Sequence, residues 1–102
     1  MTKMLTPQAY RDLKNVHQLS RRYNGPSRSA HMKKLLSLLQ EHADEISWLY
    51  KRRKAHYLVE TGDLLVLCLE ILLENKKNVD DVMALCFDRY ERKLKHLIRE
   101  RS

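Results

Sequence analysis

Two short acidic clusters hold the residue types best suited to chemistry in this chain. Glu60-Thr61-Gly62-Asp63 stands directly before an apolar run over residues 64–73, and residues 41–45 read Glu-His-Ala-Asp-Glu. In a helix, Glu60 and Asp63 share one face, and the helix they lead into is so apolar that we expect it to be buried. Two carboxylates at the edge of a core need a cation or a basic partner. Because Mg²⁺ prefers oxygen ligands, the pattern is typical of a divalent metal site.

The two clusters face each other only if the chain turns between them. Nothing from Trp48 to Tyr57 breaks a helix, yet a small domain cannot easily use one helix of more than about 40 residues, so we place a tight turn at residues 52–55. Antiparallel packing then brings three or four carboxylates to one level between two helices. The alternative, that the acids of residues 41–45 are surface groups paired with Lys or Arg, stays open.

Capping residues and apolar periodicity predict four helices. Thr6-Pro7 is a helix start, Asn24 to Ser27 ends that helix, and Asn78 followed by two acids begins the last one. Apolar residues spaced three and four apart fill the segments between these signals. We therefore expect helices over about residues 7–23, 29–51, 55–75 and 79–99. The predicted fold class is all-α, a single four-helix bundle-like domain over residues 1–102 with a central acidic hairpin.

The charge of the chain indicates anionic partners. The 102 residues carry a formal net charge of +7, with 43% hydrophobic and 32% charged residues. Basic residues gather at Arg21-Arg22, at Lys51 to Lys54, and between Arg89 and Arg101, where six Lys or Arg face two Glu. Polyanions or phosphorylated small molecules fit such blocks, and solvated helix faces are the alternative.

Several residues are expected to have no chemical role. The longest apolar run is about half of the roughly 20 residues that a membrane span needs, and the N-terminus lacks the apolar core of a signal peptide. No membrane partner is expected, and the expected location is cytoplasmic. Cys68 and Cys86 are predicted to be core residues of a protein in a reducing compartment. The remaining histidines, apart from His42, are predicted to be surface or hairpin residues: His17, His31, His56 and His96.

The segment from Leu58 to Leu67 resembles the second motif, ExxD, of the all-α nucleoside triphosphate pyrophosphohydrolases, the MazG-like family. The first motif of that family, ExxE, lies roughly one helical hairpin earlier, as the cluster at residues 41–45 does here. The likeness covers roughly residues 10 to 95. It extends to Arg22-Tyr23, to Pro26-Ser27, and to the start and the basic end of the last helix.

The resemblance implies a set of metal ligands. Glu60 and Asp63 match the second motif. In the first motif, the register that keeps apolar positions apolar matches Glu45 and puts His42 where a Glu is usual, whereas the other register uses Glu41 with Asp44. The implied ligands are Glu41, His42, Glu45, Glu60 and Asp63, with Glu45, Glu60 and Asp63 catalytic. The implied cofactor is Mg²⁺ or Mn²⁺, and a histidine ligand suits Mn²⁺, Zn²⁺ or Ni²⁺ better than Mg²⁺.

The implied activity is metal-dependent release of pyrophosphate from a nucleoside triphosphate. Basic side chains would hold the phosphates, and the candidates are Lys51, Arg52, Arg53, Arg89, Arg92 and Lys93. Trp48 is the candidate for stacking on the base, with core packing as its alternative. One alternative function is a catalytically inactive MazG-like protein that binds nucleotide or a protein partner. Another is a small basic helical protein that binds nucleic acid.

An oligomer is expected on two grounds. The third helix is apolar on more sides than three neighbours in a short bundle would cover, and such exposed apolar surface marks an interface. The resembled family also assembles as homodimers or tetramers. We therefore predict a homodimer in which the third helices pair.

Overall fold

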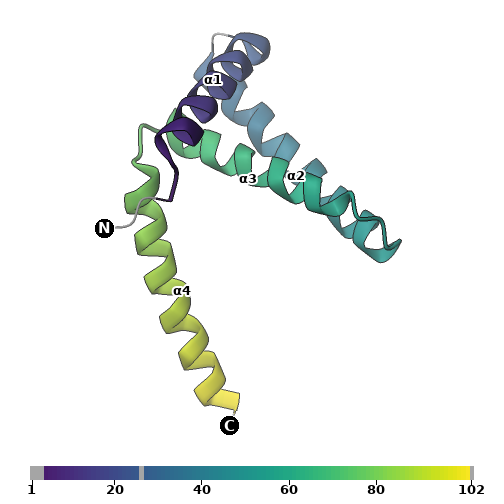
Figure 1. Ribbon diagram of the computed structural model, residues 1–102, viewed down its shortest axis with the longest axis vertical. Coiled ribbons are helices and arrows are strands. Elements are labelled where there is room, and N and C mark those ends of the chain that lie inside the picture. The colour runs from purple at the N-terminus through teal and green to yellow at the C-terminus, as the bar shows by residue number, and fades with distance from the viewer. Residues whose placement is uncertain (1–3, 26, 102) are drawn as a thin grey trace.

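The computed structural model describes residues 4–25 and 27–101 of the chain. These residues form four helices and no strand: α1 (Pro7–Asn24), α2 (Arg28–Lys51), α3 (Tyr57–Glu74) and α4 (Val79–Arg101) (Figure 1). The all-α, four-helix class is as predicted, and each helix ends within two residues of its expected limit. Pro26, which the sequence placed in the first interhelical break, lies outside the described residues.

Three side chains cap the helix starts. The side-chain oxygens of Thr6, Ser27 and Asn78 each accept a hydrogen bond from the backbone amide three residues later, at 3.0, 3.3 and 3.0 Å. Each bond satisfies an amide that has no partner inside its own helix. The caps predicted at Thr6 and Asn78 are thus confirmed.

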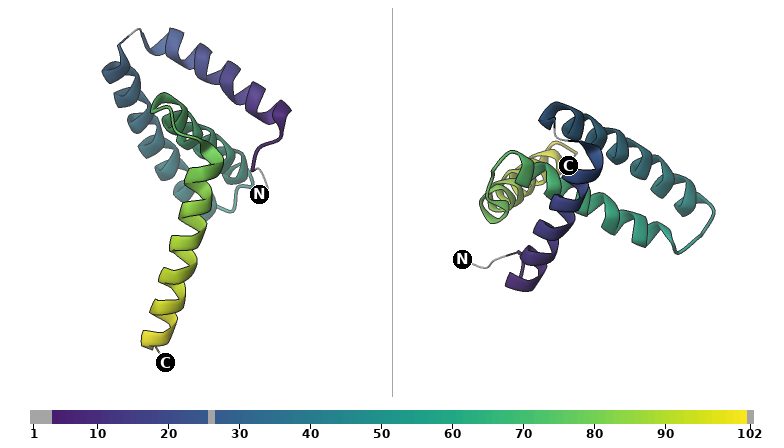
Figure 2. Two further views of the ribbon diagram at one scale, coloured as in Figure 1. Left: turned by 90° about the vertical axis from the view of Figure 1, so that its left-hand side faces the viewer. Right: turned by 90° about the horizontal axis from the view of Figure 1, so that it is seen from above.

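Helices α2 and α3 form an antiparallel hairpin, which the two further views also show (Figure 2). The chain reverses through residues 52–56, where Arg53 takes a φ of 57° in the left-handed region. This confirms the predicted turn and excludes one continuous helix. Leu35 and Leu49 of α2 and Leu67 of α3 are buried, and hydrophobic burial of this kind holds two amphipathic helices together.

Helix α1 crosses the end of the hairpin that lies far from the turn, and α4 leaves the other helices after its first turns (Figures 1 and 2). Leu13 of α1, Leu69 of α3 and Val79 of α4 form the core where these helices meet. The radius of gyration is 16.2 Å, against about 13 Å for a compact chain of this length. The accessible surface is 8311 Å², against about 6,100 Å² for a folded monomer of 12.2 kDa.

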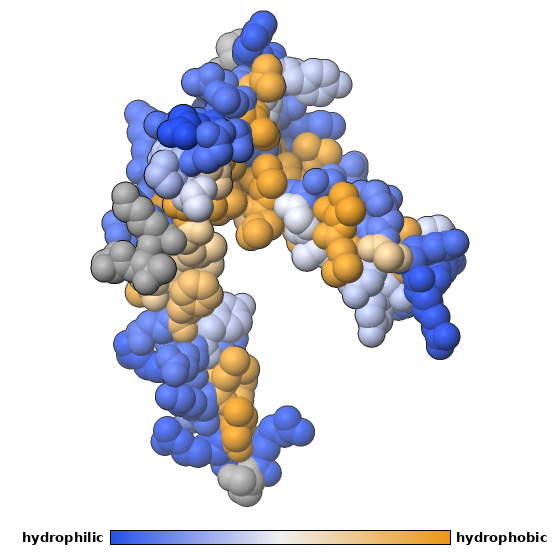
Figure 3. Space-filling view, in the orientation of Figure 1, coloured by the Kyte–Doolittle hydropathy of each residue, from blue (hydrophilic) through white to orange (hydrophobic). Residues whose placement is uncertain are grey.

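Large apolar side chains are exposed on α3 and α4, which corrects two predictions. One side of α3 faces outward and exposes Leu58, Val59, Leu65 and Val66, so the expectation that this helix is buried is wrong for a single chain. Cys68 is exposed and Cys86 is only half-buried, so neither is a core residue. Figure 3 shows apolar side chains on the hairpin and along α4, on both sides of a hollow between them. Among the described residues, no helix is long and apolar enough to cross a membrane.

Candidate metal centres

The α2–α3 hairpin brings His42 of α2 to Glu60 and Asp63 of α3. His42 Nε2 lies 3.4 Å from Glu60 Oε2 and 4.0 Å from Asp63 Oδ2. Glu60 is almost wholly buried, whereas 55% of the Asp63 side chain is exposed. Three ligand atoms of the types that bind divalent metals therefore converge, with one side open to solvent.

The hydrogen bond made by His42 Nδ1 determines whether His42 Nε2 can act as a metal ligand. His42 Nδ1 lies 2.9 Å from the carbonyl oxygen of Leu38. A carbonyl oxygen only accepts, so Nδ1 carries the hydrogen and donates it. In the neutral ring, Nε2 then directs a lone pair toward two carboxylates, which is unfavourable unless a proton or a metal ion lies between them. A ring held by Nδ1–H to a backbone carbonyl is the usual arrangement of a metal-binding histidine.

The spacing of these atoms fits a metal ion. Ligand atoms about 2.1 Å from an ion are about 3.0 Å apart at an octahedral right angle and about 3.4 Å apart in a tetrahedron. The distances from His42 Nε2, 3.4 and 4.0 Å, are close to these values, and the Asp63 side chain is 55% exposed, so it has room to turn toward an ion. His56 Nε2 lies 3.2 Å from the other oxygen of Glu60 and orients that carboxylate. His42, Glu60 and Asp63 could thus hold a divalent cation, with the Asp63 side left open to solvent.

Two residues proposed for the same site lie outside this cluster. Glu41 and Glu45 are exposed, and neither joins a metal-ligating group among the described residues. The reason is helix phase, because His42 lies seven residues from both Leu35 and Leu49, which are buried. Residues at that spacing share a helix face. The seven-residue interval in the sequence is the signal that His42, and not Glu45, faces α3.

The basic residues proposed at the hairpin are exposed at its turn. Lys51 and Arg53 line an open hollow together with Tyr50, Ala55, Tyr57 and Leu58. The guanidinium of Arg52 stacks on the Trp48 ring, 3.9 Å from its centroid. One face of the Trp48 ring is thus covered by the Arg52 cation, which is a cation–π contact.

The basic residues proposed on α4 are not brought to this site within one chain. Arg92 pairs with Asp88, Lys93 lies over the Tyr90 ring, and Arg89 lines a hollow with them on the projecting part of α4. Because α4 diverges from the hairpin (Figure 1), these cations serve the α2–α3 cluster only if another copy supplies them.

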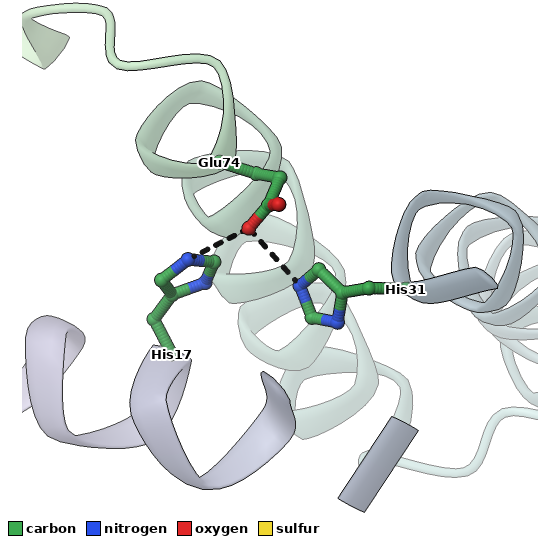
Figure 4. Close-up of side chains that lie close together, drawn as sticks. All are labelled: His17, His31 and Glu74. Carbon is green, nitrogen blue, oxygen red and sulfur yellow. Dashed lines mark ion pairs between the residues drawn. The ribbon is translucent and has the colours of Figure 1, made fainter. Parts of the chain in front are cut away.

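A second cluster joins three helices where none was predicted. His17 of α1, His31 of α2 and Glu74 of α3 direct ligand atoms toward one point (Figure 4). His31 is completely buried, so its assignment to the surface is wrong, whereas His56 and His96 are exposed as predicted. The sequence held one signal, because Glu74 follows Glu60 at twice the seven-residue interval and so shares its face of α3.

Burial lowers the pKa of His31 from its ordinary value of 6.5, and the Glu74 carboxylate opposes this shift. Burial therefore favours the neutral ring, which is the form that binds a metal.

Comparison of the chain with protein-family models, with curated proteins and with solved structures finds no match. The resemblance to the MazG-like family therefore stays a prediction from the motif residues.

Proposed function

We propose that this protein is a metal-dependent nucleoside triphosphate pyrophosphohydrolase that works as a homodimer. The main support for this proposal is that His42 Nε2 faces the carboxylates of Glu60 and Asp63, while His42 Nδ1–H donates to the carbonyl oxygen of Leu38. A divalent cation held by these three side chains would polarise a phosphoryl oxygen of the substrate and activate water for attack on it.

The remaining parts of the site supply charge and access. Lys51, Arg52 and Arg53 follow the site toward the hairpin turn and are exposed, and Arg52 would have to leave the Trp48 ring to reach the outer phosphates. The exposed Asp63 leaves room for those phosphates beside the cluster. Because His42 replaces one carboxylate, Mn²⁺ suits this ligand set better than Mg²⁺.

A homodimer accounts for the surface that one chain leaves uncovered. The chain exposes about 2,200 Å² more than a folded monomer of its mass, and a standard interface buries about 800 Å² on each partner. On α3, the exposed Leu58, Val59, Leu65 and Val66 recur at helical spacing around Gly62, and no charged residue interrupts that face. A second copy is the partner that presents the same uncharged face, so the contact is self-complementary.

Gly62 is a further reason to expect a second copy of the chain on this face of α3. Glycine inside a helix costs about 0.5–1 kcal/mol relative to alanine, and a Cβ added at Gly62 would meet nothing within the chain. A closely approaching helix of a second copy is a reason for its small size. In such a dimer, α4 of one copy could cover the hairpin of the other and bring Arg89, Arg92 and Lys93 to the site.

The test is release of pyrophosphate from nucleoside triphosphates with Mn²⁺ or Mg²⁺, comparing wild type with Asp63→Asn. This change removes the ligand charge at a half-exposed position and should preserve the fold. Asp88→Asn is the matched control, because Asp88 is an exposed aspartate of α4 that pairs with Arg92. We expect at least a 100-fold loss for Asp63→Asn only. Equal turnover of both variants would refute the mechanism.

One observation favours a second candidate, a MazG-like protein that binds nucleotide without hydrolysing it. Glu45, the first-motif carboxylate, is exposed and outside the cluster. Calorimetric titration with nucleoside triphosphate separates the two candidates, since binding without turnover in Mg²⁺, Mn²⁺ and Zn²⁺ supports the second. Binding to nucleic acid that weakens steeply with salt, with no nucleotide binding, would favour the nucleic-acid alternative over both.

A further inference from the structure

The ligand atoms of His17, His31 and Glu74 surround one point at the junction of α1, α2 and α3 (Figure 4). Glu74 Oε2 lies 3.1 Å from His17 Nε2 and 3.7 Å from His31 Nε2. Ligands about 2.1 Å from a tetrahedral ion are about 3.4 Å apart. The two measured distances stand on either side of that value, and all three ligand atoms lie within 4.8 Å of one another.

The two carboxylate oxygens of Glu74 face different partners. Oε1 lies 3.3 Å from Arg21 Nη1 and 4.0 Å from Arg28 Nε, on the outer side of the cluster. Oε2 is left to the two histidines. Arg21 therefore orients the carboxylate without occupying the oxygen that faces the rings, as the outer groups around bound metals do.

Each histidine ring is held through its Nδ1 atom. His17 Nδ1 lies 3.4 Å from Oε1 of the buried Glu70, which can only accept, so Nδ1 carries a hydrogen, and Nε2, 3.1 Å from Glu74 Oε2, would hold the ion in place of a second proton. This carboxylate–histidine pair is a common support of bound zinc. His31 Nδ1 lies 3.1 Å from Asn24 Nδ2, which in this orientation of the amide donates to it. Turning that amide by 180° presents its oxygen to Nδ1–H and frees Nε2 of His31 as a ligand.

The inner atom of His31 is unsatisfied. Its Nε2 is completely buried and has no hydrogen-bond partner among the described residues, and Glu74 Oε2 lies 3.7 Å away, beyond hydrogen-bond distance. Buried polar atoms of this kind are rare, and each calls for an unseen partner. A metal ion between Nε2 and Oε2 would satisfy both atoms.

We propose that His17, His31 and Glu74 form a second metal site, separate from the one at His42, that binds Zn²⁺ or a similar borderline divalent ion. Two imidazoles and one carboxylate select Zn²⁺, Co²⁺ or Ni²⁺ over Mg²⁺. His17 borders an open hollow at the surface, through which water would reach the fourth position of a bound ion. The ion joins one ligand from each of three helices, so its role is to hold α1 against the hairpin.

The test is Zn²⁺ binding by calorimetry to metal-free protein, in wild type and in His42→Gln/Asp63→Asn, which removes the first site. We expect one Zn²⁺ to remain bound to that double variant. Glu74→Gln should abolish this binding, and Glu70→Gln should weaken it 10–100-fold, as supporting residues do. His96→Gln, an exposed histidine of α4, is the control and should leave it unchanged.

A measurement on the wild-type protein guards against misfolded variants. On addition of Zn²⁺, the ring ¹⁵N resonances of His17 and His31 should shift at Nε2, while Nδ1 of His17 keeps its proton. Loss of all Zn²⁺ binding in the double variant would overturn the proposal. Unchanged His17 and His31 resonances would also overturn it and leave the cluster as an ion-pair network only.

Discussion

Glu74→Gln, studied with a chelator present, should destabilise the fold even when no metal is bound. The carboxylate is buried, with 7% of its side chain exposed, and it lies near cationic or ionisable groups from two other helices. Oε2 faces His17 and His31, and Oε1 faces Arg21 and Arg28. Glutamine keeps the shape of the side chain but removes the charge that these groups share.

The size of the effect follows from the exposure of the partners. Removing one member of a buried ion pair costs about 3–5 kcal/mol. Arg28 is 62% exposed, so water solvates its guanidinium when the Glu74 charge is removed, and the loss of this ion pair contributes almost nothing. Arg21 is 33% exposed and partly compensated. We therefore expect a loss of about 2–3 kcal/mol in the free energy of unfolding, or about 10–20 °C in Tm for a domain of this size.

Urea unfolding followed by circular dichroism, at one protein concentration because a dimer is stabilised by concentration, measures the loss. Glu100→Gln is the matched control, since Glu100 pairs with His96 on the surface of α4 and both side chains are more than half exposed. Its effect should stay within about 0.5 kcal/mol. If Glu74→Gln costs no more than Glu100→Gln, the cluster does not hold the three helices together.

Three further outcomes are expected. His42→Glu restores a carboxylate to the first site and should shift the ratio of Mg²⁺-supported to Mn²⁺-supported activity upward by about tenfold; an unchanged ratio would remove His42 from the site. Leu65→Glu should weaken dimerisation by at least about 100-fold in light scattering, whereas Leu19→Glu, an equally exposed leucine of α1, should not. Because burial lowers the pKa of His31 from 6.5, His31 binds a proton more readily in the unfolded chain than in the folded one. The unfolding free energy of metal-free protein should therefore fall as pH drops from 7.5 to 5.5, by at most about 1.4 kcal/mol per pH unit, and less in His31→Gln.

The helix limits could be predicted because they depend on local chemistry. A capping side chain needs only the amide three residues ahead, so Thr6 and Asn78 marked their helix starts without any knowledge of the fold. The turn after Lys51 was harder, since Arg53 takes its left-handed conformation without glycine. Only the excessive length of one uninterrupted helix predicts this turn, and that length is a constraint on the whole chain.

The ligands at the first site were predictable only in part. Glu60 and Asp63 follow from their spacing and from the apolar helix behind them. The choice between His42 and Glu45 required the phase of α2 against α3, because two residues three apart lie about 60° apart around a helix and packing decides which one faces inward.

The sequence by itself determined the four helices, the positive charge and the acidic pair at Glu60 and Asp63, since all of these depend on residues close together in the chain. The tertiary structure alone brought His17, His31 and Glu74 together, because they come from three helices and share no local pattern. It also decided that one side of the apolar α3 stays uncovered. Periodicity shows that a face is apolar, but only the placement of the neighbouring helices shows whether that face is buried within one chain or left for another.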